Sequence, residues 1–191
     1  GREQIGLLNA IIVAFGGDDF PVDRAFASLA KAARVPTALD LSRRGWNVAV
    51  EGQRPSLDRY LTSGYYPEGC NAWACANETL EMAGADYALA TLAQHLGDED
   101  SYQEFVTRSQ SWQNQFNPDA TAGGGYFQGR MQDGSWVSGF DPSSDAGFVE
   151  GTAAQYVWMV QHDVAGLFDA MGGNDRAVSP ASSGTHRGTG C

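Results

Sequence analysis

The segment GFVEGTAAQYVWMVQHDV, residues 147–164, is mostly apolar and aromatic, yet it carries groups that can move protons or bind polar ligands. Glu150 stands near its start, and His162 and Asp163 form a pair near its end. Carboxylates among aromatic side chains are typical of glycoside hydrolysis, in which one acid protonates the leaving oxygen and another carboxylate activates water or attacks the sugar. Glu150 is therefore a candidate general acid.

A carboxyl group that must hold its proton near neutral pH needs a raised pKa, and apolar walls raise it by desolvating the anion. Phe148, Tyr156 and Trp158 could build such walls. A helix that started at Glu150 would act in the opposite direction, because its dipole favours the charged form. Burial must outweigh the dipole for an acid role. The alternative is that Glu150 is a helix-start carboxylate and that His162 and Asp163 are a structural pair.

Two long helices are predicted in the middle of the chain, at 78–97 and 98–117, because apolar residues recur there at helical spacing. Gly97 is expected to end the first helix, and Asp98 to cap the second. Such a short connection predicts that the two helices are antiparallel neighbours. The same periodicity predicts helices at 21–34, 56–66 and 150–171.

Residues 124–140 are rich in glycine and aromatic residues, and Asp133-Gly134 between Tyr126-Phe127 and Trp136-Val137 is a strong hairpin signal. Helical hairpins joined by such loops predict an all-α domain over residues 1–178, with the chemistry on the loops. The tail 179–191 has no large apolar side chain and is predicted to be disordered.

The amino-acid composition argues against several classes of partner and site. Asp and Glu number 23 against 12 Lys and Arg, and the net charge of -11 argues against nucleic acid or an anionic membrane surface as partner. No apolar run approaches the ~20 residues of a membrane-spanning helix. The three cysteines match no zinc or redox spacing. Cys70 and Cys75 could form one disulfide, which the odd cysteine count leaves open.

Several segments, in order, resemble glycoside hydrolase family 92, the exo-acting α-mannosidases. RYLTSGYYPEG (59–69) is similar to the family's YL..GYVP turn, and the helix at 78–97 to its TLEYAYDDYAIAQLAKALG. FVTRSQSWQNQFNP (105–118) resembles F..RSQNY.NLFDP, and YFQGRMQDGSWVSGFDP matches FMRGRN.DGSW...FDP. The segment 147–173 resembles GF.EGNAWQYTWFVPHDV.GLI.LMGG. The resemblance runs from about residue 20 to 178.

The resemblance implies a partial (α/α)6 toroid from an inverting α-mannosidase, with α-1,2-linked mannose in an oligosaccharide as substrate. It also implies a secreted or extracellular enzyme and a calcium ion that binds sugar hydroxyls, with most of its ligands outside this chain. Glu150 stands where the family has its general acid. The resemblance gives pocket, substrate-binding or supporting roles to Gln155, His162, Asp163, Arg130, Trp136 and Asp141.

The chain also departs from the family pattern. Thr152 replaces an Asn and Ala154 a Trp in the acid motif, and Gln161 replaces the Pro before His-Asp. The family enzymes are several times longer, and the motifs with the catalytic base and most calcium ligands do not occur here. We therefore interpret the chain as an internal fragment whose partner is the rest of the enzyme. The alternatives are a non-catalytic carbohydrate-binding helical domain and an inactive partial gene product, which the start at Gly1 and the abrupt tail favour.

Overall fold

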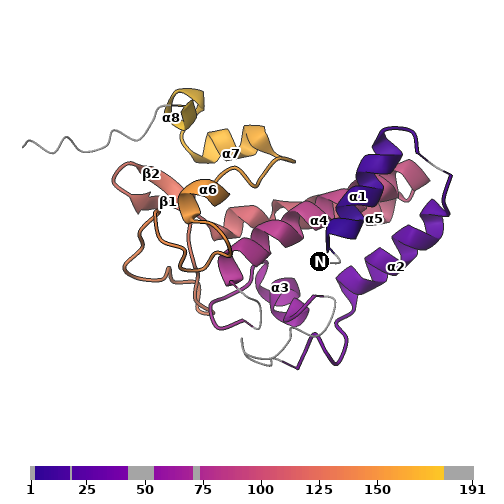
Figure 1. Ribbon diagram of the computed structural model, residues 1–191, viewed down its shortest axis with the longest axis horizontal. Coiled ribbons are helices and arrows are strands. Elements are labelled where there is room, and N and C mark those ends of the chain that lie inside the picture. Colours follow the sequence, from indigo (N-terminus) through magenta and orange to yellow (C-terminus); the bar gives the residue numbers. More distant parts are fainter. Residues whose placement is uncertain (1–2, 18, 43–53, 71–73, 179–191) are drawn as a thin grey trace, which may run out of the picture.

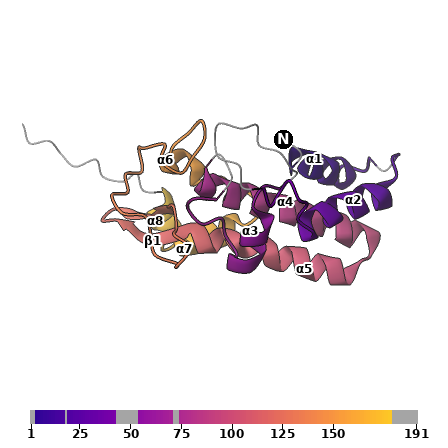
Figure 2. The same ribbon diagram turned by 90° about the horizontal axis from the view of Figure 1, so that it is seen from below.

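The computed structural model describes residues 3–17, 19–42, 54–70 and 74–178, and its framework is a set of helices around α4 (Cys75–Leu96). Helix α5 (Glu99–Ser109) folds back along α4. Helices α1 (Glu3–Ala14) and α2 (Val22–Arg34) pack near the C-terminal end of α4. Figure 2 shows that α1 and α2 lie at one end of α4, and that the strands and α6 lie at the other.

The turn between α4 and α5 forms as predicted. Gly97 adopts φ +70, and the backbone N–H groups of Gly97 and Asp98 donate to carbonyls in the last turn of α4. The Asp98 carboxylate accepts a hydrogen bond of 3.1 Å from the backbone N–H of Ser101, which caps α5. The predicted helices at 21–34 and 56–66 are also confirmed, as α2 and as α3 (Leu57–Ser63), which ends at Gly64. Helix α1 was not predicted.

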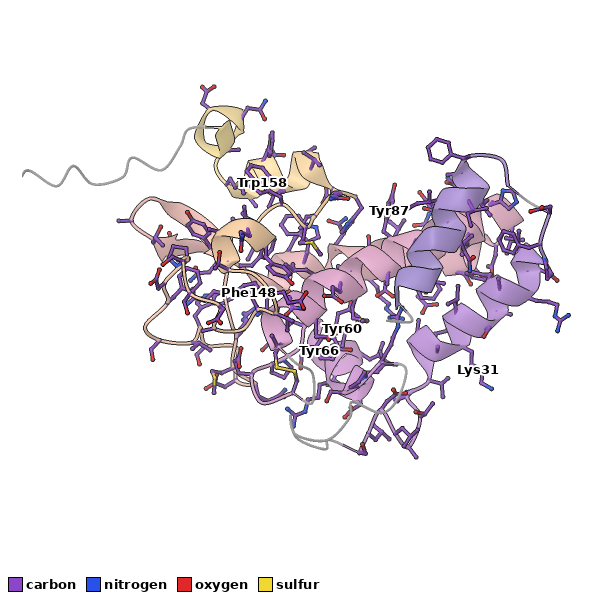
Figure 3. The ribbon with its side chains drawn as sticks, viewed as in Figure 1. Lys31, Tyr60, Tyr66, Tyr87, Phe148 and Trp158 are labelled. Carbon is purple, nitrogen blue, oxygen red and sulfur yellow. A yellow bond between two sulfur atoms is a disulfide. The ribbon has the colours of Figure 1, made fainter. Side chains whose placement is uncertain are left out.

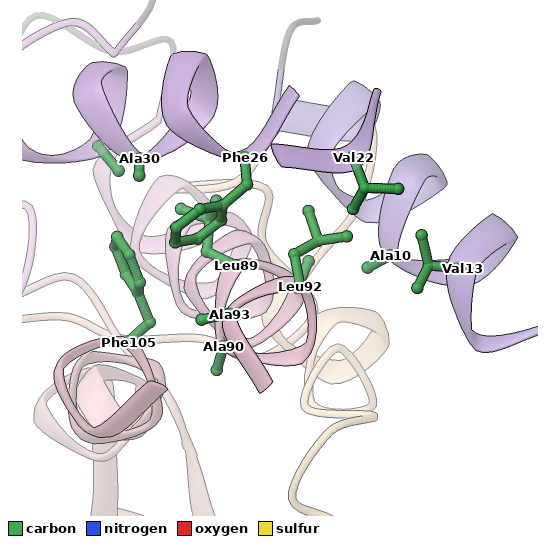
Figure 4. Packing of buried hydrophobic residues seen from close by; sticks show 12 residues of the cluster. Ala10, Val13, Val22, Phe26, Ala30, Leu89, Ala90, Leu92, Ala93 and Phe105 are labelled. Atoms are coloured by element: carbon green, nitrogen blue, oxygen red, sulfur yellow. The ribbon is translucent and has the colours of Figure 1, made fainter. Parts of the chain in front are cut away.

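Helix α4 contributes to three apolar clusters. Near its C-terminal end, Leu89 and Leu92 pack against α1, α2 and Phe105 of α5 (Figure 4). Near its N-terminal end, Ala76 and Leu80 pack against aromatic and aliphatic side chains from the segment after α5, from the strands and from the C-terminal segments, namely Trp112, Phe116, Phe127, Phe148, Ala153, Val160 and Leu167. The third cluster joins α4 to α3 through Leu57, Tyr60, Tyr66, Cys75 and Met82. The helices and the loop regions thus share one central element.

The expectation of an all-α domain is wrong in one place, because the chain contains a small antiparallel sheet. The helix predicted to reach residue 117 ends at Ser109, continues as the 3-10 helix η1 (Gln110–Gln115), and is followed by β1 (Phe116–Thr121). β1 pairs with β2 (Gly124–Phe127), with Phe116 opposite Phe127. A Cβ on Gly125 would lie 2.5 Å from the Phe116 ring, so the glycine permits this ring to pack across the strands.

The predicted turn at Asp133-Gly134 forms. The backbone N–H of Met131 donates to Ser135 O, and that of Val137 donates to Gly129 O. The two sides of this turn form an isolated bridge, between Arg130 and Trp136, and not a regular pair of strands. The Cys70–Cys75 disulfide, which the sequence left open, is present.

The single helix predicted at 150–171 is wrong. The segment contains two short helices, α6 (Ala153–Tyr156) and α7 (Val164–Ala170), followed by α8 (Asn174–Val178). Thr152 is the N-cap of α6 and Asp163 is the N-cap of α7, so a new helix begins at each of these two positions. The apolar periodicity reflects packing of Val157, Val160 and Leu167 into a core, not one continuous helix. No helix in the described ranges is long and apolar enough to span a membrane, and the tail 179–191 lies outside the described residues.

Candidate active site

Glu150 occupies an unusual backbone conformation. It lies three residues before α6 and adopts φ +56, and Ser56 is the only other non-glycine residue with positive φ among the residues described. Positive φ is uncommon outside glycine because the side chain crowds the backbone. The side chain of Glu150 is exposed, so the burial that the sequence predicted for it is not found in this chain.

Hydrogen bonds on both sides hold this turn. Thr152 and Gln155 form a capping box at the start of α6, in which the Thr152 N–H donates to Gln155 Oε1 at 2.9 Å. The Tyr156 hydroxyl donates to Val149 O at 2.7 Å, and the Tyr156 ring packs on Phe148. Figure 3 shows Phe148 close to the N-terminal end of α4. Gln155, a predicted substrate-binding residue, therefore uses its side-chain oxygen to fix the Glu150 turn.

Several carboxylates lie near Tyr156, beside the Glu150 turn. Burial raises the pKa of the Tyr156 hydroxyl, and the nearby carboxylates of Glu81, Glu150 and Glu78 raise it further. Tyr156 therefore keeps its proton and remains a donor to Val149 O. The structure thus places carboxylates of α4 and the predicted acid around one tyrosine.

His162 and Asp163, which adjoin in sequence, have separate partners. The His162 Nε2–H donates to Ser109 O at 3.0 Å when this nitrogen carries the proton, and the ring stacks on Tyr87 with centroids 5.3 Å apart. Burial lowers the His162 pKa, which favours the neutral ring. Asp163 caps α7 by accepting from the Gly166 N–H at 3.0 Å. In the described part of the chain, neither side chain bonds to Glu150.

Arg130 and Trp136 form one stack with Tyr65. The Arg130 guanidinium lies 4.8 Å from the Trp136 ring centroid and 5.0 Å from the Tyr65 centroid. It also donates to Gly134 O and Asn114 O, at 2.9 and 2.8 Å. One face of Trp136 is therefore covered by a cation and is not open to a sugar.

Asp141 is exposed and closes a local turn. Its carboxylate accepts from the Ser143 N–H at 2.9 Å and from the Ser143 hydroxyl at 2.7 Å. These two hydrogen bonds lower the Asp141 pKa. Asp141 therefore shapes the loop that precedes the Glu150 turn.

Sequence reasoning overlooked Glu68. Its side chain is half-buried, and burial raises its pKa. The signal was its place in GYYPEG, within a segment that resembles a family turn. Position in the chain alone did not distinguish it from a surface carboxylate.

Calcium does not fit the described residues by themselves. Over residues 3–17, 19–42, 54–70 and 74–178, no group of three or more His, Cys, Asp or Glu side chains could hold a metal ion. Calcium favours six to eight oxygen ligands, several of them carboxylates. No chemical step is therefore assigned to calcium here.

Comparison with known proteins identifies relatives of this chain. Residues 4–182 match the family model described as the glycosyl hydrolase family 92 catalytic domain. A solved family GH92 inverting mannosidase from Bacteroides thetaiotaomicron is 25% identical, with a TM-score of 0.75 over 90% of this chain and 21% of the other. A family GH92 α-mannosidase from the same organism is 28% identical, with a TM-score of 0.70 over 90% and 20%.

A second structure of that α-mannosidase, in complex with mannoimidazole, is also similar, with a TM-score of 0.67. This chain spans about a fifth of the length of these solved structures. Among curated proteins, none matches the chain.

Proposed function

The chain belongs to glycoside hydrolase family 92, and we propose that it forms part of the catalytic domain of an inverting α-mannosidase in which Glu150 is the general acid. Its helices would then be one part of an (α/α)6 toroid. The proposed substrate is a mannose-containing oligosaccharide with α-1,2-linked mannose. A calcium ion, which would bind sugar hydroxyls, would take most of its ligands from outside this chain.

The backbone of Glu150 is the observation that carries the proposal. A non-glycine residue in the left-handed region costs about 1–3 kcal/mol and persists only where its surroundings determine it. Such residues cluster at active sites. Here the capping box and the Tyr156–Val149 hydrogen bond hold the turn and present the carboxyl group to solvent.

In this mechanism, Glu150 donates its proton to the glycosidic oxygen as the bond to the anomeric carbon breaks. A water molecule attacks the opposite face of the sugar, activated by a second carboxylate roughly 6.5–9.5 Å from the acid. Phe148 and Tyr156 lie next to the turn as apolar surface. A bound sugar would displace water from Glu150, and this desolvation favours the protonated form that an acid requires.

For the chain by itself, a second candidate function is carbohydrate binding without turnover. The exposure of Glu150 favours it, because the carboxyl group lacks the dry surroundings of a general acid. This candidate requires only that the loops present polar groups to a sugar.

The test uses a longer family enzyme that carries this segment, with Glu150→Gln and, as a matched control, Glu99→Gln on the exposed start of α5. General acid catalysis contributes about 10²–10⁴-fold. We expect a loss of kcat in that range for mannosides with poor leaving groups, and a much smaller loss for aryl mannosides, which need little protonation.

Equal losses for both substrates would exclude the acid role. The purified 191-residue chain is expected to show no turnover of either substrate. Turnover by this chain that disappears in Glu150→Gln would show that it carries its own catalytic base.

A further inference from the structure

Glu68 lies in a short turn between α3 and α4 whose backbone is fixed on two sides. Its N–H donates to Arg130 O at 2.8 Å, which attaches the turn to the 129–137 loop. Two residues after Glu68, Cys70 forms a disulfide with Cys75, the first residue of α4, and this bond attaches the turn to the helix. The position of the Glu68 side chain is therefore set by the loop and by the helix together.

The carboxylate of Glu68 lies against two glycines, Gly129 and Gly147. Glu68 Oε1 lies 2.6 Å from the point where a Cβ on Gly129 would stand, and 3.6 Å from the corresponding point at Gly147. Gly147 precedes Glu150 by three residues, and its carbonyl accepts from the Asn77 N–H. The Glu68 carboxylate thus lies near both the 129–137 loop and the segment that leads to the proposed acid.

No protein group in the described part of the chain satisfies this carboxylate. It makes no hydrogen bond or ion pair there, although Arg130 is attached to the same turn. The Arg130 guanidinium instead faces the rings of Tyr65 and Trp136. Burial of part of the side chain raises the Glu68 pKa, so the carboxylate is held partly desolvated without a protein donor among the residues described. The side chain remains half-exposed, so an outside donor can reach it.

We propose that Glu68 is a sugar-binding carboxylate of this site, which accepts hydrogen bonds from hydroxyl groups of the mannose ring. The inference rests on the proposed function. Two oxygens of one carboxylate match two neighbouring hydroxyls of a sugar, and hydroxyl-to-carboxylate bonds are short and strong. A metal ion fits less well, because no three-group ligand cluster occurs among the residues described.

The experiment titrates methyl α-D-mannopyranoside into the isotope-labelled 191-residue chain and follows amide signals by NMR. We expect shifts in the signals of residues 147–156 and of Glu68. Because hydroxyl donors favour the charged form of a carboxylate, the Glu68 carboxyl pKa should fall when the sugar binds. Hydrogen bonds to charged groups predict that Glu68→Gln weakens binding about 10- to 100-fold.

A second variant moves the carboxylate without removing it. In Gly129→Ala the new methyl group would meet the flexible end of Glu68, and we expect a similar loss of affinity. The matched controls are Gly84→Ala, where a Cβ meets nothing within 4 Å, and Asp100→Asn on the exposed start of α5. Both controls should bind the sugar as the parent does.

The outcomes separate this inference from the proposed function. If residues 147–156 respond to the sugar but Glu68→Gln binds within twofold of the parent, the Glu68 proposal is overturned and the site stands. If Glu68→Gln does not fold while Gly129→Ala folds and binds normally, Glu68 is structural and the proposal is also overturned. If no signal in the parent chain responds to saturating sugar, the Glu68 proposal is overturned, whereas the acid role of Glu150 is decided separately by the substrate comparison in the longer enzyme.

Discussion

The two ends of α4 differ in what stabilises them. The helical end, made of α1, α2, α5 and the C-terminal half of α4, combines apolar packing with a buried ion-pair network. The loop end, residues 116–171, also has an apolar cluster, but its loops are shaped by hydrogen bonds between side chains and nearby backbone, as at Asp133, Asp141 and Thr152. All predicted site residues lie in the loop end. The comparison indicates a stable scaffold and a separately shaped surface for chemistry.

The ion-pair network is centred on Asp86 in the middle of α4. This carboxylate is fully buried and receives hydrogen bonds from Arg54, Arg108 and the Tyr60 hydroxyl, all at 3.1 Å. Burial and the negative charge of Asp86 raise the pKa of Tyr60, which remains a donor. The network joins α4 to α3, α5 and the segment before α3.

The largest expected effect is that of Asp86→Ala. The substitution removes the buried carboxylate that Arg54 and Arg108 share, and breaking a buried pair typically costs about 3–5 kcal/mol. Urea denaturation should show a loss of this size in the free energy of unfolding. Asp100→Asn, an exposed control on α5, should stay within about 0.5 kcal/mol of the parent. A small loss for Asp86→Ala would remove the basis for calling the helical end the scaffold.

Reduction of the Cys70–Cys75 disulfide tests whether the two ends of α4 unfold separately. The disulfide closes a short loop, with a sequence separation of 5, so opening it should cost about 2 kcal/mol in the chain-entropy model. Amide exchange should increase mainly around Glu68 and the first turn of α4. Exchange that rises equally in α2 and α5 would mean that the ends do not unfold separately.

Removal of a helix cap in the loop end should cost less. Asp163→Ala removes the acceptor for the Gly166 N–H, and loss of an N-cap typically costs about 1 kcal/mol. The change should appear as lost amide protection in α7, with α4 unaffected. Asp163→Asn retains an acceptor and is the matched control. A cost equal to that of Asp86→Ala would contradict the contrast between the two ends.

The smallest expected effect concerns pH. Burial lowers the His162 pKa below its usual value of about 6.5, so the unfolded chain binds the proton more readily than the folded chain. The stability from the neutral ring is therefore present above pH 6.5 and is lost as pH falls through the lower, folded pKa. Urea denaturation at several pH values should show a shallower pH dependence in His162→Gln. An unchanged pH profile would mean that this ring does not titrate on unfolding.

Patterns local in sequence predicted the helical end well. Apolar spacing, the Gly97 termination and the Asp98 cap depend on neighbours within a few residues, and α2 and α4 formed where these signals placed them. Helix α5 began at its predicted cap but ended at Ser109, and α1 was not predicted. The loop end was predicted less well because its apolar residues serve a shared core. Phe116 and Val160 occur at helical spacing, yet one lies in a strand and the other between two short helices.

By itself, the sequence determined the helical hairpin, the Asp133-Gly134 turn and the position of Glu150 in a segment that resembles an acid motif. Tertiary structure alone decided that Glu150 is exposed on a left-handed turn and that His162 binds Ser109, 53 residues away. It also decided that Glu68 sits against Gly129 and Gly147. The physical reason is distance along the chain. Burial, charge pairing and the loss of water at a group depend on residues that only folding brings together.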